Sequence, residues 1–97
     1  MAIVVVFDIP GATQAQYDAA IAALVGPGKS FNVPSDLPVP GLISHVAGPR
    51  PGGWHVTDVW ESQAAFNAFT AVLMPILAGV GIPAVPPKVF EAHKYVH

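Results

Sequence analysis

The sequence predicts an α+β fold with the order strand, helix, strand, strand, helix, strand. The first observation is the β-branched run at residues 3–7, which is continuous as in a buried strand. The second is a pair of segments, after Thr13 and after Ser62, whose large apolar residues recur at helical spacing. The third is a hairpin pattern, with strands expected at residues 42–47 and 54–60 around a turn at 48–53. This order is that of the ferredoxin-like fold.

The first helix is expected between a cap at Thr13 and a stop at residues 26–28. Gln16, three residues after Thr13, completes a capping-box pattern. Residues 26–41 then form a long connection with four prolines. Connections of this length are uncommon in a small domain and are often functional. The connection is read either as a lid over a pocket or as a loop that wraps an edge or a partner.

The second helix is expected to begin at a Ser62 cap and to end at Gly79 and Gly81. Pro75 lies inside its apolar pattern and should bend or interrupt it. A last strand is expected over residues 88–96. The whole chain, residues 1–97, is interpreted as one domain, since 97 residues leave little room for a second.

Charge is scarce, with four basic and six acidic residues in a chain that is 53% apolar. This composition excludes disorder, and four scattered basic residues do not suit nucleic acid. The chain has no cysteine, which excludes disulfides and zinc–thiolate sites. The segment 64–87 is uncharged and long enough to span a bilayer, but Pro75 and Pro83 would break a membrane-spanning helix. No membrane association is therefore expected, and the cytoplasm is the expected location.

The predicted sheet has apolar residues on both faces. In the expected fold two helices cover one face and leave the other open. Val59 lies opposite in parity to Trp54, Val56 and Trp60, so the open face would also carry apolar side chains. An uncovered apolar face predicts association. The sequence therefore predicts a homodimer formed sheet on sheet.

The segment Val59-Trp60-Glu61-Ser62, running into residues 64–69, resembles the end of the third strand and the second helix in the antibiotic-biosynthesis-monooxygenase family. Members are dimeric α/β barrels of similar length. The resemblance implies a monooxygenase that needs no cofactor and acts on an apolar, aromatic or polyketide-type molecule. The haem-degrading branch pairs its Trp with an Asn on the first strand and a His on the second helix, and this sequence has neither. The alternative is a non-catalytic protein of the same fold that binds a small ligand or serves an accessory role.

Strand register decides what His45 faces. If the numbers of paired hairpin residues sum to an even value, His45 shares a face with His55 and Thr57, and a metal site would be conceivable there. If the sum is odd, His45 shares a face with Trp54, Val56, Asp58 and Trp60. We expect the odd register, which places a histidine and a carboxylate in an aromatic-lined space. No metal is expected, since His93 and His97 lie about 13 Å apart on a strand.

In that arrangement His45 is the predicted base and Asp58 the group that orients it. Trp54 and Trp60 are the predicted walls of the pocket, although both would also serve as ordinary core residues. The remaining predicted substrate-binding residues are Tyr17, Phe66, His93 and Tyr95. The predicted ligand is an apolar small molecule.

Overall fold

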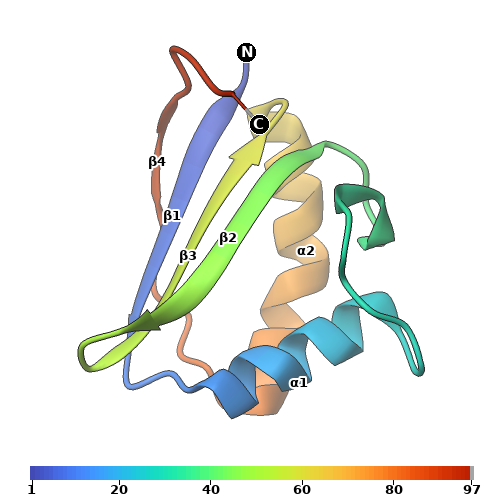
Figure 1. Cartoon of the computed structure of the whole chain (residues 1–97), viewed down its shortest axis with the longest axis vertical. Helices are drawn as coiled ribbons and strands as arrows, with labels where there is room; N and C mark the ends of the chain where they lie inside the picture. The colour runs from blue at the N-terminus through green and yellow to red at the C-terminus, as the bar shows by residue number, and fades with distance from the viewer. Residues whose placement is uncertain (97) are drawn as a thin grey trace.

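Four antiparallel strands form an open sheet, and two helices cover one of its faces (Figure 1). The computed structural model describes residues 1–96. The strands are β1 (Ile3–Pro10), β2 (Leu42–Arg50), β3 (Gly53–Trp60) and β4 (Lys88–Glu91), and the helices are α1 (Gln14–Val25) and α2 (Gln63–Val80). The sheet order is β2-β3-β1-β4. The α+β class is as predicted, and the arrangement is compatible with a ferredoxin-like fold.

The strand β1 alternates in burial although its sequence is continuously apolar. Ile3, Val5 and Ile9 are buried on the helix-covered face, whereas Val4 and Val6 are only half-buried. This alternation is as expected for a sheet whose helices cover one face and leave the other open. The reason is that both helices lie on the same side of the sheet (Figure 1).

Both predicted helix caps are confirmed. The Thr13 hydroxyl accepts from the Gln16 amide at 3.2 Å, and the Gln16 side chain accepts from the Thr13 amide at 3.1 Å. The Ser62 hydroxyl accepts from the Ala65 amide at 3.1 Å and starts α2. The helix then runs without a break through Pro75 to Val80. Pro75 therefore does not interrupt the helix. Gly81, one of the two glycines predicted to end it, is its C-cap in the left-handed conformation.

Gly41 allows β2 to start close beneath α2. Its φ of +110° suits glycine, and a Cβ there would lie 2.5 Å from the Cβ of Ala65. The carbonyl of Gly41 accepts from the Glu61 amide at 2.8 Å. This close approach fixes the end of β3 and the start of α2 against the start of β2.

The hairpin is tighter than predicted, and its register is the odd one. Strand pairing continues to Arg50 and Gly53, so only residues 51–52 form the turn, and the predicted turn at 48–53 is too long. His45 pairs with Asp58, which confirms the odd register. The even register, with His45 beside His55, is excluded, since His55 pairs with Gly48.

The C-terminal strand is shorter than predicted. β4 ends at Glu91, so the expectation of a strand over residues 88–96 is wrong beyond that point. His97, considered above with His93 as a metal ligand, lies outside the described residues. The connection 26–41 contains one short 3-10 helix, η1 (Pro34–Asp36). A carboxylate oxygen of Asp36 accepts from the amides of Asn32 and Val33, at 2.8 and 3.0 Å, which fixes the turn before η1.

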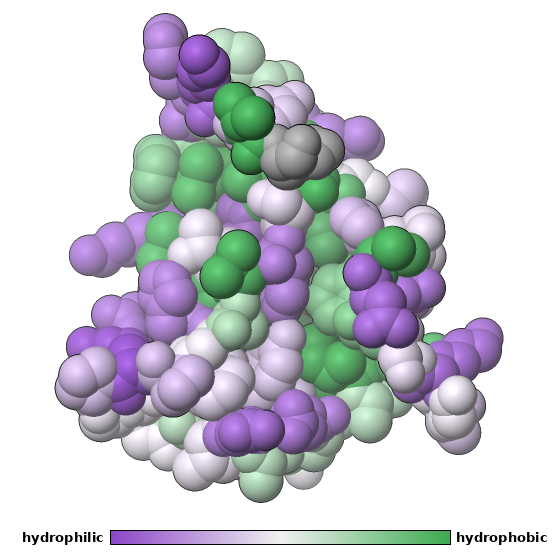
Figure 2. Space-filling model, in the orientation of Figure 1, coloured by the Kyte–Doolittle hydropathy of each residue, from purple (hydrophilic) through white to green (hydrophobic). Residues whose placement is uncertain are grey.

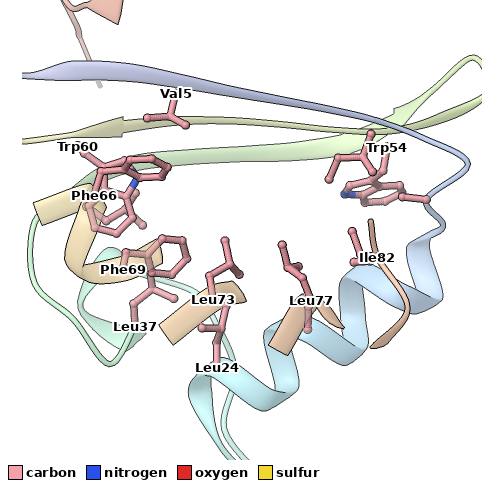
Figure 3. Close-up of a cluster of buried hydrophobic side chains, with 14 of the residues drawn as sticks. Val5, Leu24, Leu37, Trp54, Trp60, Phe66, Phe69, Leu73, Leu77 and Ile82 are labelled. Atoms are coloured by element: carbon pink, nitrogen blue, oxygen red, sulfur yellow. The ribbon is translucent and has the colours of Figure 1, made fainter. Parts of the chain in front are cut away.

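The core lies between the sheet and α2. Trp60 is fully buried, and its ring packs on Phe69 with 4.8 Å between ring centroids. Figure 3 shows these rings, with Phe66, at one end of the layer and Trp54 at the other. The apolar stripe of α2 supplies the opposite wall, through Phe66, Phe69, Leu73 and Leu77. By length and composition alone α2 would be able to cross a membrane; in this fold its stripe packs on the sheet.

Candidate functional site

A buried carboxylate and an imidazole face each other across the hairpin. Asp58 on β3 is 3% exposed, and its Oδ1 lies 2.6 Å from Nδ1 of His45 on β2. The two residues are direct partners in the strand register. Pairing of β2 with β3 therefore fixes both backbones, and the side chains meet on the face that the helices cover.

Tyr17 on α1 extends this pair into a line of three groups. Its hydroxyl lies 2.7 Å from Nε2 of His45, and the two rings are nearly parallel. Burial raises the pKa of Tyr17 above 10.0, and the negative charges of Asp58 and then Asp18 add to the rise. The phenol therefore stays protonated at neutral pH. When the neutral imidazole carries its proton on Nδ1, it donates to Asp58 and its Nε2 accepts from Tyr17.

Asp58 is held from a second direction by Trp60. The indole Nε1 of Trp60 donates to Oδ2 of Asp58 at 3.3 Å. Both carboxylate oxygens thus accept a hydrogen bond in the core. Such bonds fix the orientation of the carboxylate toward His45.

A cavity of about 70 Å³ lies beside this line, between the sheet and the helices. Nine of its sixteen lining residues are aliphatic, most of them from β1, α1 and α2, and the aromatic members are Phe7, Tyr17, Phe31, Trp54 and Phe69. His45 and Asp58 also line it. An engineered cavity that admits benzene measures about 150 Å³, so this cavity alone has room for a small substituent of a ligand and not for its ring.

A second hollow of about 320 Å³ adjoins the first. It lies between residues 31–34 of the connection and residues 42–45 of β2. Tyr17, Phe31 and His45 line both hollows. The ring of Phe31 packs on His45 with 5.0 Å between centroids. A ligand that spans both hollows would therefore pass directly along the Tyr17–His45 hydrogen bond.

The structure brings together four of the predicted site residues: His45, Asp58, Trp54 and Tyr17 all line the inner cavity. Trp60 lies behind Asp58 as its hydrogen-bond donor. Phe66 packs in the core between Trp60 and Phe7, with centroids 6.0 and 6.2 Å away.

The structure places His93 and Tyr95 apart from this group. Both are exposed, on the segment that follows β4. Sequence reasoning did not single out Phe31, although it is the aromatic residue of the proline-rich connection 26–41. Its contact with His45 depends on how that connection folds back over β2, which no local pattern indicates.

Among residues 1–96 no group of three or more His, Asp or Glu side chains is arranged to hold a metal ion. The titratable residues that line the inner cavity are Tyr17, His45 and Asp58, the three groups of the hydrogen-bonded line. In comparisons with known proteins, the chain matches no family model and no curated protein.

Proposed function

We propose that the protein is a small enzyme that removes a proton from a hydroxyl group of an apolar, aromatic or polyketide-type molecule. The observation that carries this proposal is the hydrogen-bonded line Asp58–His45–Tyr17 beside an apolar cavity. A base in an apolar site is most effective when a third group orients it and balances its charge. Asp58 has both roles toward His45.

In the proposed step the substrate hydroxyl gives its proton to the Tyr17 oxygen while the Tyr17 proton moves to Nε2 of His45. The substrate becomes an oxyanion, Tyr17 is unchanged, and His45 becomes an imidazolium paired with the Asp58 carboxylate. The route is short, because Tyr17 and His45 are already 2.7 Å apart. His45 is therefore the base through Tyr17, and Asp58 and Trp60 are positioning residues.

The proposed reaction that follows is cofactor-free oxygenation, in which the deprotonated substrate supplies all four electrons that reduce dioxygen. One oxygen atom replaces a ring hydrogen and becomes a carbonyl, the other leaves as water, and a phenol is converted to a quinone. The segment from Val59 to Phe69 supports this choice through its resemblance to the antibiotic-biosynthesis monooxygenases. The finer fold assignment, a ferredoxin-like dimeric α/β barrel, belongs to the same proposal. Its support is the strand order β2-β3-β1-β4 and an open apolar sheet face.

The open face supports a homodimer through the sheet. Strand pairing aligns Phe90, Val4 and Val59 in one row across β4, β1 and β3. Phe90 is 54% exposed and Val46 on β2 is 65% exposed. Figure 2 shows apolar surface over β4 and β1. We propose a second copy of the chain as the occupant, because a sheet that is exposed in both copies can pack face to face by symmetry.

The test is oxygen consumption with a panel of two- and three-ring phenols. We expect uptake with the wild-type protein for at least one phenol, and loss of that uptake in His45→Gln and Tyr17→Phe. Ligand affinity, measured by calorimetry, should stay within a few fold in both variants. Uptake that persists in both variants would overturn the proposed role of the line.

A second candidate function is a non-catalytic ligand-binding protein. The observation that favours it is that Tyr17, His45, Asp58 and Trp60 satisfy one another without a ligand. Such a protein would bind phenols of the panel and consume no oxygen with any of them.

A further inference from the structure

Trp54 carries a buried donor without a protein partner. Among residues 1–96 its indole Nε1 is the buried side-chain polar atom for which no acceptor is in reach. The residue is 8% exposed and lines the inner cavity. Figure 3 shows the indole nitrogen on the side of the ring that faces the space between the sheet and α2.

A buried N–H without an acceptor is costly, since it has lost its hydration and gained no bond in return. Native structures satisfy nearly all such groups, and an exception calls for a reason. Trp60, the other indole, shows the usual outcome, because its N–H donates to Asp58. The donor of Trp54 thus differs from that of Trp60 in having no protein group to receive it.

We infer that Trp54 selects ligands that carry an acceptor oxygen, a carbonyl in particular, and donates its indole N–H to that oxygen. This inference rests on the proposed function only in using the same cavity. A ligand oxygen in the inner cavity would give this N–H the acceptor that no protein group supplies. Tyr17 packs on Trp54 with 5.2 Å between ring centroids. The preferred substrate therefore has a carbonyl oxygen at Trp54 and a hydroxyl at Tyr17.

The direct test follows the two indole N–H signals in a ¹⁵N-correlated NMR spectrum of the full chain. The probes are acetophenone and α-methylstyrene, which have nearly the same shape but differ in a carbonyl oxygen against a methylene group. Trp54→Phe assigns the two signals. Acetophenone is expected to move the Trp54 signal downfield, as a new hydrogen bond does, and α-methylstyrene is not. If acetophenone binds and the Trp54 signal does not move in this way, the inference is overturned.

Affinity provides the second readout. The two probes differ in their own hydrophobicity, so the informative quantity is the ratio of their dissociation constants. We expect that ratio to shift about tenfold against acetophenone in Trp54→Phe, the factor that one hydrogen bond is worth. The matched control is Trp60→Phe, which also removes an indole from the core. Its ratio should stay within about twofold of the wild-type value, and an equal shift in both variants would overturn the inference.

The outcomes separate this inference from the proposed function. If the Trp54 signal shifts but the protein consumes no oxygen with any phenol, the ligand preference is supported and the proposed enzymatic activity is overturned. If the protein consumes oxygen with a phenol but the Trp54 signal does not move, the enzymatic activity is supported and the ligand preference is overturned. If neither probe binds up to its solubility limit, the cavity is not a ligand site and the inference fails.

Discussion

His45 and Asp58 are direct partners across β2 and β3, with Nδ1 of the imidazole 2.6 Å from Oδ1 of the carboxylate. The other carboxylate oxygen accepts from the indole of Trp60 at 3.3 Å. One buried carboxylate therefore receives two donors from two elements of the site. Each of the two carboxylate oxygens therefore has its own partner in the core.

Asp58→Asn is expected to lower the free energy of unfolding by about 1–3 kcal/mol, the cost of one unsatisfied buried donor. An amide offers one acceptor oxygen, so either His45 or Trp60 would face an NH₂ group. Urea denaturation at neutral pH measures the loss. The matched control is Asp8→Asn, since Asp8 is an exposed carboxylate paired with Arg50 at 2.8 Å. The control should lose no more than about 0.5 kcal/mol, and equal losses in the two variants would contradict the interpretation.

The raised pKa of Tyr17 predicts a loss of stability in alkali. Burial is the main cause of the rise above 10.0, so the folded chain holds this proton more tightly than the unfolded chain does. The contribution is fully present below the unfolded-state pKa and is lost as the pH rises through the folded-state pKa. The free energy of unfolding should therefore decrease as the pH rises above 10.0, the ordinary pKa of tyrosine. In Tyr17→Phe that decrease should be smaller, and identical slopes in the two proteins would exclude Tyr17 as the source.

The start of α2 depends on the Ser62 cap. Its hydroxyl accepts from the Ala65 amide, which otherwise has no partner in the first turn. Ser62→Ala should lower the free energy of unfolding by about 1 kcal/mol, and Ser62→Asp, which restores an acceptor, should recover most of it. Thermal unfolding of the three proteins compares them. A loss in Ser62→Asp as large as in Ser62→Ala would show that the cap contributes nothing.

The register of the hairpin shows how much of the candidate site is predictable from the sequence. Apolar residues occur at both parities in the third strand, so the pattern alone allows either face of β3 to be covered. The odd register follows from favouring the face with Trp54, Asp58 and Trp60, and the structure has that register. Parity also allows His45 to pair with residue 56 or 60, so the direct pairing of His45 with Asp58 comes from the structure.

Contacts between distant elements were not predictable in the same way. Tyr17 reaches His45 only because α1 crosses the sheet at the level of β2, and no local pattern encodes that position. The Phe31 contact depends likewise on the path of the connection 26–41. The predicted last strand was too long for a different reason. β4 pairs with β1 only as far as Ile3 opposite Glu91, so the residues after Glu91 have no strand to pair with.

The proposed dimer makes the last prediction. Val59→Lys would place a charge in the middle of the open sheet face, beside Val4. Burying that ammonium group against a second sheet is costly, so the variant should dissociate. Sedimentation at micromolar concentration should give a mass of about 20 kDa for the wild type, twice the 10.1 kDa of the chain. The variant should sediment as a monomer.

Val33→Lys is the matched control, because Val33 is 50% exposed on the connection 26–41, beside the hollow that Tyr17 and His45 line, and is not part of the open sheet face. It adds the same charge to the chain, so a dimer that survives Val33→Lys and not Val59→Lys locates the interface on the sheet. Net repulsion between copies would instead weaken both variants equally. A wild-type protein that sediments at about 10 kDa would overturn the dimer itself. The half-buried Val4 and Val6 would then be a face that the chain leaves open to water.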